Sequence, residues 1–145
     1  MTGDGVVLSA ERRRGLQLGL WAVVLAYAGV IFYLSTQSNP LPALTAHVWD
    51  KLLHLTEYGG LGFWLAVALG QLGRLGRRET FAWATLLGVL YGASDEFHQS
   101  FVPGRDCELG DVLADGLGSA LGASIALALA WAVAARRARL GRHER

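Results

Sequence analysis

The sequence has a single cysteine, a single lysine and only three prolines in 145 residues. With Cys107 alone, no disulfide can form within the chain. The sequence holds no internal repeat, no low-complexity tract and no room for a second domain. It also has no His-Glu-x-x-His, no nucleophile elbow and no paired-cysteine metal site. The chain is therefore one compact domain with no known catalytic signature.

Apolar residues, by contrast, are abundant: they make up 52% of the chain, and the mean hydropathy is positive. Four apolar stretches run over about 16–35, 52–73, 81–101 and 111–135, each long enough for a helix to cross the roughly 30 Å hydrocarbon core of a membrane. Short polar connections separate them, including Asn39-Pro40-Leu41-Pro42. In a soluble protein of 145 residues, four apolar stretches of this length would leave too few polar residues to cover the surface. We therefore predict an all-α, integral membrane four-helix bundle that forms one domain over residues 1–145.

The basic residues predict an orientation. Eleven of the thirteen Lys and Arg residues lie before the first stretch, between the second and third, or after the fourth. Four crossings place these three segments on one side, which the positive-inside rule makes the cytoplasm. Eight of the twelve acidic residues and three of the four histidines fall in the other half. We expect a multi-pass protein of the bacterial cytoplasmic membrane, with both termini in the cytoplasm and an acidic outer face.

Three of the stretches carry polar faces at their outer ends. In the second, for example, Asp50, His54 and Glu57 are spaced by four and three residues, so they share one helical face. An ionisable side chain at the bilayer centre costs roughly 2.5–3.5 kcal/mol, so we expect these faces to meet around one pocket rather than face lipid. The candidate binding residues are Asp50, Lys51, His54, Tyr58, Asp95, Glu96, Gln99, Arg105, Asp111 and Asp115. Arg105, beside a Pro-Gly turn, is expected to pair with Glu96, Asp111 or a head group.

The order of these residues resembles the VanZ-like family. The resemblance rests on Asp50-Lys51-x-x-His54-x-x-x-Tyr58, then Glu96-x-x-Gln99-x-x-x-Pro103-Gly104-Arg105, then Asp111-x-x-x-Asp115-x-x-Gly118-x-x-x-Gly122, and it spans about residues 24–130. Asp115 stands where many members have Asn. The family's named member is associated with low-level teicoplanin resistance in bacteria. The resemblance thus implies a multi-pass membrane protein of the cell envelope, but no particular biochemical activity.

The first functional hypothesis is a site that binds or handles an anionic envelope lipid or its head group, with Lys51 and Arg105 holding phosphate. The partner would be membrane lipid, not nucleic acid, and the oligomeric state stays open. An enzyme acting on such a lipid is an alternative, with His54, Glu57, Glu96 and His98 as candidate acid–base residues. No cofactor or metal site is expected, although in that alternative the acids could hold a divalent cation. A proton-linked transporter and a structural polar network are the remaining readings.

Overall fold

The computed structural model describes residues 3–38, 47–105 and 107–143. Over these ranges the chain is entirely helical apart from its turns, with no strand. The helices are α1 (Gly3–Ser35), α2 (His47–Gly70), α3 (Arg77–Gln99) and α4 (Leu109–His143). The predicted all-α bundle of four helices is confirmed.

The helix bounds differ from the predicted ones in a way that has physical causes. α1 begins well before residue 16, and α4 continues well past residue 135, because no proline interrupts these charged ends and Arg and Ala favour a helix. α2 ends at Gly70, before the predicted residue 73, and Gly73 then adopts a positive φ of 66° that turns the chain toward α3.

Three of the helices contain segments long and apolar enough to cross a membrane: Glu11–Ser35, Asp50–Gly70 and Leu109–Gly141. α3 does not qualify by composition, because it begins with Arg77-Arg78-Glu79 and ends near Asp95-Glu96. Its polar residues Thr80, Asp95, Glu96 and Gln99 are buried inside the bundle. The low hydropathy of α3 therefore reflects polar side chains that face other helices, not a helix that avoids the bundle.

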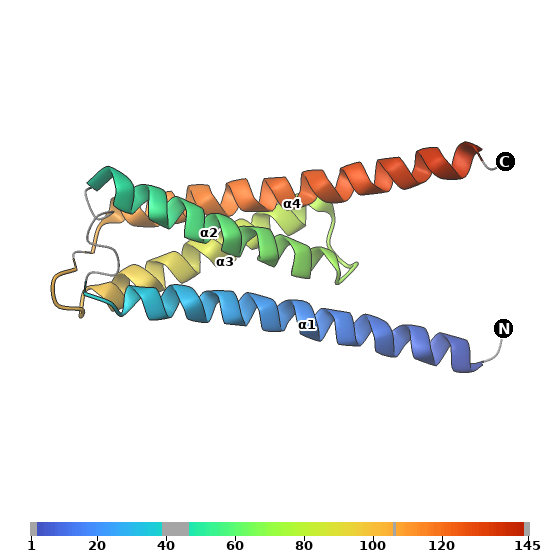
Figure 1. Cartoon of the computed structure of the whole chain (residues 1–145), viewed down its shortest axis with the longest axis horizontal. Helices are drawn as coiled ribbons and strands as arrows, with labels where there is room; N and C mark the ends of the chain where they lie inside the picture. Colours follow the sequence, from blue (N-terminus) through green and yellow to red (C-terminus); the bar gives the residue numbers. More distant parts are fainter. Residues whose placement is uncertain (1–2, 39–46, 106, 144–145) are drawn as a thin grey trace.

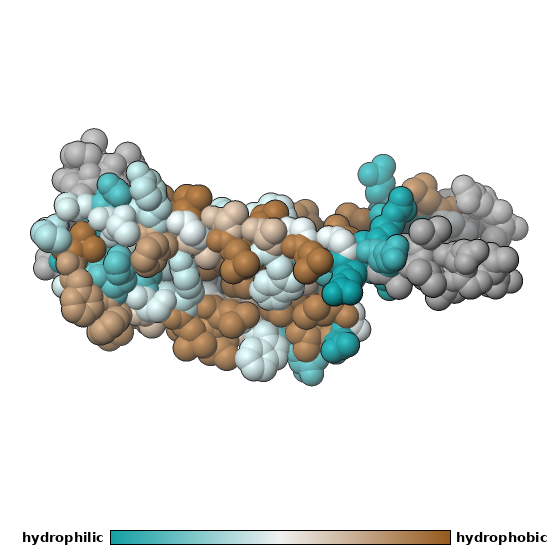
Figure 2. Space-filling view, turned by 90° about the horizontal axis from the view of Figure 1, so that it is seen from below, coloured by the Kyte–Doolittle hydropathy of each residue, from teal (hydrophilic) through white to brown (hydrophobic). Residues whose placement is uncertain are grey.

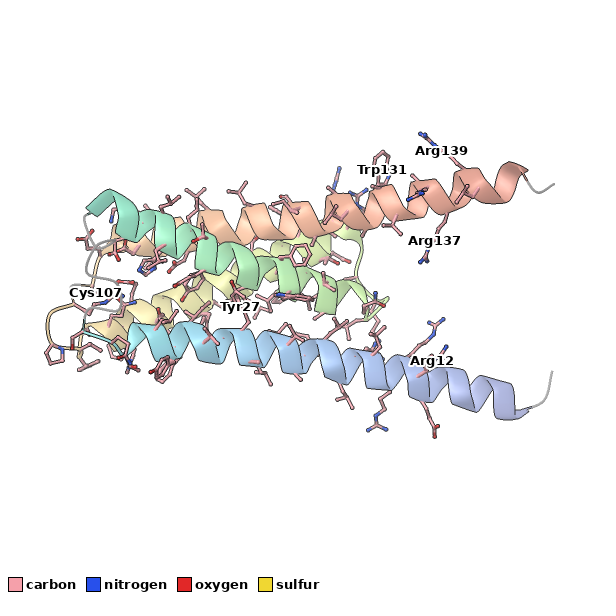
Figure 3. The ribbon with its side chains drawn as sticks, in the orientation of Figure 1. Arg12, Tyr27, Cys107, Trp131, Arg137 and Arg139 are labelled. Carbon is pink, nitrogen blue, oxygen red and sulfur yellow. The ribbon has the colours of Figure 1, made fainter. Side chains whose placement is uncertain are left out.

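The four helices run alongside one another, and the two termini lie at the same end of the bundle (Figure 1). We call this the basic end, because Arg12, Arg137 and Arg139 all lie there (Figure 3). The opposite end, where Cys107 lies, is called the acidic end: there α1 and α3 finish and α2 and α4 begin. Charges of opposite sign are thus separated along the bundle, as the sequence predicts.

α2 and α4 form the tightest contact of the bundle, and glycines make it possible. A side chain at Gly62 would run into the backbone of Ser119, and one at Gly118 would run into the carbonyl of Leu55. Gly122 likewise lies against Gly59. Small residues allow helix backbones to approach closely where lipid supplies no hydrophobic driving force. We call this contact the α2–α4 seam; it holds the start of α4 directly against the start of α2.

α1 is the peripheral helix. It packs mainly on α2, touches α3 only slightly, and makes no contact with α4 over the described ranges. Large apolar side chains on its outer side are exposed, among them Leu18, Leu25 and Tyr33, each more than 60%. Similar side chains cover the outside of the other helices, and Figure 2 shows them as a brown region across the middle of the bundle. Such a surface fits contact with lipid tails.

Candidate functional site: a buried polar cluster at the acidic end

A cluster of buried polar side chains lies inside the acidic end. Its members come from α2, α3 and α4, and each is at most 4% exposed. They are His54, Asp95, Glu96, Gln99, Asp111 and Asp115. We call this set the acidic-end cluster. The sequence predicted that the polar faces of three helices meet around one pocket. The structure brings these side chains into one cluster, although Glu96 and Asp111 do not line the pocket described below.

His54 lies at the centre of the cluster. Its Nδ1 is 2.9 Å from Asp115 Oδ1, across the α2–α4 seam. Its Nε2 is 3.9 Å from Glu96 Oε1 of α3, too far for a hydrogen bond. One imidazole therefore links carboxylates from two other helices, with a direct bond on one side only.

Lys51 lies at the rim of the cluster. Its Nζ donates to Glu108 Oε2 at 2.8 Å and to Asp111 Oδ1 at 2.9 Å. The backbone N–H of Glu108 in turn donates to Glu96 Oε2 at 3.1 Å. The loop before α4 is thus tied to both α2 and α3. Lys51 was predicted from the sequence to hold phosphate, but in the structure it forms ion pairs with two carboxylates.

Arg105 has partners other than the predicted ones. Its Nε donates to Gln99 Oε1 at 3.1 Å, and its Nη1 is 3.9 Å from Asp50 Oδ1. Pairing with Glu96 or Asp111 was therefore the wrong expectation, because Glu96 receives the Glu108 N–H and Asp111 receives Lys51. Gly104, with a φ of 82°, reverses the chain just before Arg105 and directs it back over α3.

A small pocket opens beside His54. Its wall is apolar where α1 contributes Ile31 and Leu34 and α2 contributes Leu53, and it is polar elsewhere. The remaining lining residues are Ser35, His54, Glu57, Asp95, Gln99 and Arg105. The cavity offers about 20 Å³ to the centres of water-sized molecules, enough for a water or a small ion. The site is thus a narrow amphipathic pocket, closed on one side by the loosely packed α1.

The other candidate residues fall in different places. Glu57 is half-buried and lines the pocket. Tyr58 is fully buried below His54, with the two rings parallel and their centroids 6.4 Å apart, so it packs in the core. His98 lies outside the cluster: its ring packs on Phe32 of α1 with centroids 4.7 Å apart. Of the four acid–base candidates, His98 is the one that the structure sets apart.

Two residues of this region were not among the sequence candidates. Glu108 holds Lys51 and, through its backbone, Glu96. Ser119, fully buried in the α2–α4 seam, donates its hydroxyl to the Tyr58 carbonyl at 3.4 Å and leaves no room for a side chain at Gly88. Its spacing of four residues from Asp115 was the available signal, since both share the inner face of α4.

Negative charge exceeds positive charge at this end. Among the described residues, seven carboxylates lie near Lys51, His54 and Arg105, and five of the seven have no cation within hydrogen-bond distance other than His54. Buried polar atoms of Asp95, Glu96 and Asp115 each lack a hydrogen-bond partner among the described residues. The carboxylates are Asp50, Glu57, Asp95, Glu96, Glu108, Asp111 and Asp115. Such an excess is costly in a water-poor interior unless protons or a further cation neutralise it.

The side chains that could hold a metal ion centre on His54. Donor atoms of His54, Glu96 and Asp115 lie within 4.8 Å of one another, as do those of Asp50, His54 and Asp111. The donors are one imidazole nitrogen and several carboxylate oxygens. Such nitrogen and oxygen donors suit divalent ions that do not require thiolate ligands.

Comparison with protein families gives one match: the family described as VanZ/LLP1 aligns with residues 20–131. The matched range covers three-quarters of the chain and includes every residue of the acidic-end cluster. The resemblance inferred from the motifs is confirmed. Comparisons with curated proteins and with solved structures find no match.

Proposed function

Because the chain belongs to the VanZ/LLP1 family and carries helices apolar enough to span a membrane, we propose that its acidic-end pocket binds the head group of an anionic envelope lipid. The pocket is the observation that carries this proposal. Apolar side chains of α1 meet polar side chains of α2 and α3 there. This lining matches a lipid at the junction between its head group and its tails.

The proposal includes an orientation. All four helices cross the bacterial cytoplasmic membrane, the basic end lies in the cytoplasm, and the acidic end meets the outer leaflet. The separation of charge along the bundle supports this, since basic residues are retained on the cytoplasmic side. α3 crosses with the others because its charged residues near Asp95 face the bundle interior.

Lateral entry from the bilayer suits the packing of α1. The pocket lies between α1 and the rest of the bundle, and α1 makes the fewest contacts of the four helices. A small displacement of α1 would widen the pocket toward lipid without disturbing the α2–α4 seam. The head group would then enter beside Ile31 and Leu34 while its tails remain in the membrane.

Arg105 is the residue best placed to hold a phosphate. Its side chain is 12% exposed, so it lies at the mouth of the pocket. Its close hydrogen bond is to the neutral Gln99, and its ion pair with Asp50 is long at 3.9 Å. A guanidinium has five N–H donors and binds phosphate in a bidentate manner, so donors remain for a head group.

The test is the lipid that copurifies with the protein. The wild type, Arg105→Ala and the control Arg74→Ala are purified in mild detergent, and bound lipids are extracted and identified by mass spectrometry. We expect the wild type and Arg74→Ala to retain an anionic lipid and Arg105→Ala to lose it, with all three equally stable. Equal lipid retention by Arg105→Ala would contradict the proposal.

The same proposal can be extended to a phenotype in cells, namely tolerance to the glycopeptide teicoplanin. If the pocket handles an envelope lipid, production of the protein raises tolerance to teicoplanin in a susceptible bacterium. Arg105→Ala would not raise it, whereas Arg74→Ala would. Tolerance that is equal for both variants would separate the phenotype from the pocket.

One observation favours an enzyme as the second candidate. Asp115 and His54 form a buried carboxylate–imidazole pair at 2.9 Å, the arrangement that orients a histidine as a general base. An enzyme would change the mass of the bound lipid with time, and His54→Gln would stop this change. A lipid whose mass stays constant over hours in the wild type would favour binding alone.

A further inference from the structure

The distance between His54 and Glu96 has a specific chemical meaning. Nε2 of His54 and Oε1 of Glu96 are 3.9 Å apart, and Oε1 has no hydrogen-bond partner among the described residues. The gap is too long for a hydrogen bond. Two ligands that each lie about 2.0–2.2 Å from a common ion are separated by roughly 3–4 Å. The separation of the two atoms therefore falls in the range found for two ligands of one metal ion.

Both flanking groups are held in place by partners behind them. His54 Nδ1 lies 2.9 Å from Asp115 Oδ1. An ionised Asp115 accepts the Nδ1–H, and a neutral imidazole held in this way carries its lone pair on Nε2. The Glu108 N–H donates to Glu96 Oε2 at 3.1 Å, which leaves Oε1 as the free oxygen. A carboxylate behind a ligating histidine and a hydrogen bond behind a ligating carboxylate are the usual supports of a metal site.

Further oxygen ligands lie close to the same imidazole. Asp50 and Asp111 each bring a carboxylate oxygen within 4.8 Å of a donor atom of His54. Asp95, only 4% exposed, has one oxygen without a hydrogen-bond partner and lines the pocket beside His54. The pocket, the unpartnered Asp95 oxygen and the oxygens of Glu96, Asp50 and Asp111 thus all lie around the same imidazole, that of His54.

We propose that His54 Nε2 and Glu96 Oε1 bind a divalent transition-metal ion, with Asp115 as the positioning residue. The donor set is an imidazole with carboxylates and no thiolate, since Cys107 is exposed in the loop. Zn²⁺ and Mn²⁺ accept such mixed donors, whereas Mg²⁺ takes oxygen ligands almost exclusively. The ion offsets part of the negative excess of the acidic-end cluster.

The ion would also help to bind the lipid head group, and this step alone rests on the proposed function. A phosphate entering a pocket with more carboxylates than cations meets repulsion. An ion held by His54 and Glu96 presents open coordination positions to a phosphate oxygen. The head group would then be held by the ion on one side and by Arg105 on the other.

The experiment begins with the wild-type protein, purified in detergent with any affinity tag removed. Its metal content is measured by inductively coupled plasma mass spectrometry, and we expect about one divalent ion per chain. Dialysis against EDTA lowers the thermal midpoint, and Zn²⁺ or Mn²⁺ restores it while Mg²⁺ does not. Co²⁺ added to the dialysed protein gives visible d–d absorption that reports a nitrogen–oxygen site. No bound ion and no response to Zn²⁺, Mn²⁺ or Co²⁺ in a folded, dialysed protein would overturn the proposal.

Variants locate the ion. Glu96→Gln removes a ligand charge and should abolish Co²⁺ absorption. Asp115→Asn keeps the shape of the side chain and should weaken affinity by roughly 10- to 100-fold while full occupancy returns at high metal concentration. His98→Ala, which removes the neighbouring histidine outside the cluster, should bind like the wild type. Loss of binding in His98→Ala with retention in Glu96→Gln would place the ion elsewhere and reject the site.

The two proposals fail separately. If EDTA removes the ion and the anionic lipid together, both hold. Lipid that stays bound at full stoichiometry after the ion is removed contradicts the bridging role and leaves lipid binding standing. A protein with the ion but without lipid contradicts the proposed function and leaves the metal site standing.

Discussion

The basic end of the bundle exposes its charged side chains, whereas the acidic end buries several of its own. At the basic end, Arg12, Arg77, Arg137 and Arg139 are exposed, and Figure 3 shows Arg139 pointing away from the bundle. At the acidic end, the residues of the acidic-end cluster are at most 4% exposed and lie between α2, α3 and α4. Exposed charges at the end of a membrane helix can set its orientation without contacting any partner. Buried charges persist only where other helices supply partners, so the acidic end is where a binding role is to be sought.

The largest loss of stability is expected from His54→Ala. The change removes the partner of Asp115 and the basic group nearest Glu96, both almost fully buried. Removing one partner of a buried charged group typically costs about 3–5 kcal/mol, because here the Asp115 carboxylate stays buried without its hydrogen-bond partner. The thermal midpoint in detergent should fall sharply.

Two control variants for His54→Ala are available, one at each end of the bundle. His98→Ala removes a histidine that packs on Phe32 outside the cluster, and Arg139→Ala removes an exposed charge at the basic end. Both should leave the midpoint nearly unchanged. A similar fall for all three variants would mean that burial at the acidic end carries no special energetic weight.

The next largest effect is expected from Gly118→Ala. A side chain here would run into the Leu55 carbonyl, next to His54, and so force α2 and α4 apart. Overpacking of this kind costs about 1–3 kcal/mol. It should also lengthen the His54–Asp115 contact. Gly19→Ala, where a new methyl group meets nothing within 4 Å, serves as the control and should be neutral.

A smaller effect is expected from Lys51→Met. The variant keeps the aliphatic stem and loses both ion pairs at the rim, where the Lys51 and Glu108 side chains are each 41% exposed. The pair with Glu108 is exposed, so it contributes little and salt screens it. The pair with Asp111, whose side chain is only 4% exposed, accounts for most of the expected loss. The midpoint should drop less than for His54→Ala, and the difference from the wild type should shrink as salt rises. A drop equal to that of His54→Ala would make the rim as important as the buried centre.

Much of this architecture could be predicted from helical spacing. Asp50, His54 and Glu57 repeat at intervals of four and three, and the glycines at 118 and 122 repeat at four, so their faces and close approach follow from helix geometry. The meeting of three polar faces followed from the cost of placing charges against lipid. The four helices and the acidic-end cluster were therefore accessible from the sequence.

The individual pairings were not accessible in this way. Arg105 contacts Gln99 and Asp50 instead of Glu96, because the turn at Gly104 and the loop at Glu108 decide which oxygens are left free. Helical periodicity gives the face of a residue but not its rotamer or the path of a loop. The burial of polar residues in α3 was not accessible from composition either. Composition does not distinguish a polar side chain that faces another helix from one that faces water.

The most direct test asks which side of the membrane the acidic end faces. Cys107, the single cysteine, is exposed at the acidic end, and Arg139 lies at the basic end (Figure 3). Intact cells are treated with a membrane-impermeant maleimide, using the wild type and a variant that combines Cys107→Ser with Arg139→Cys. We predict that Cys107 is labelled in intact cells and that the cysteine placed at position 139 is labelled only after permeabilisation. The reverse pattern, with position 139 labelled in intact cells and Cys107 protected, would contradict an outward-facing lipid pocket.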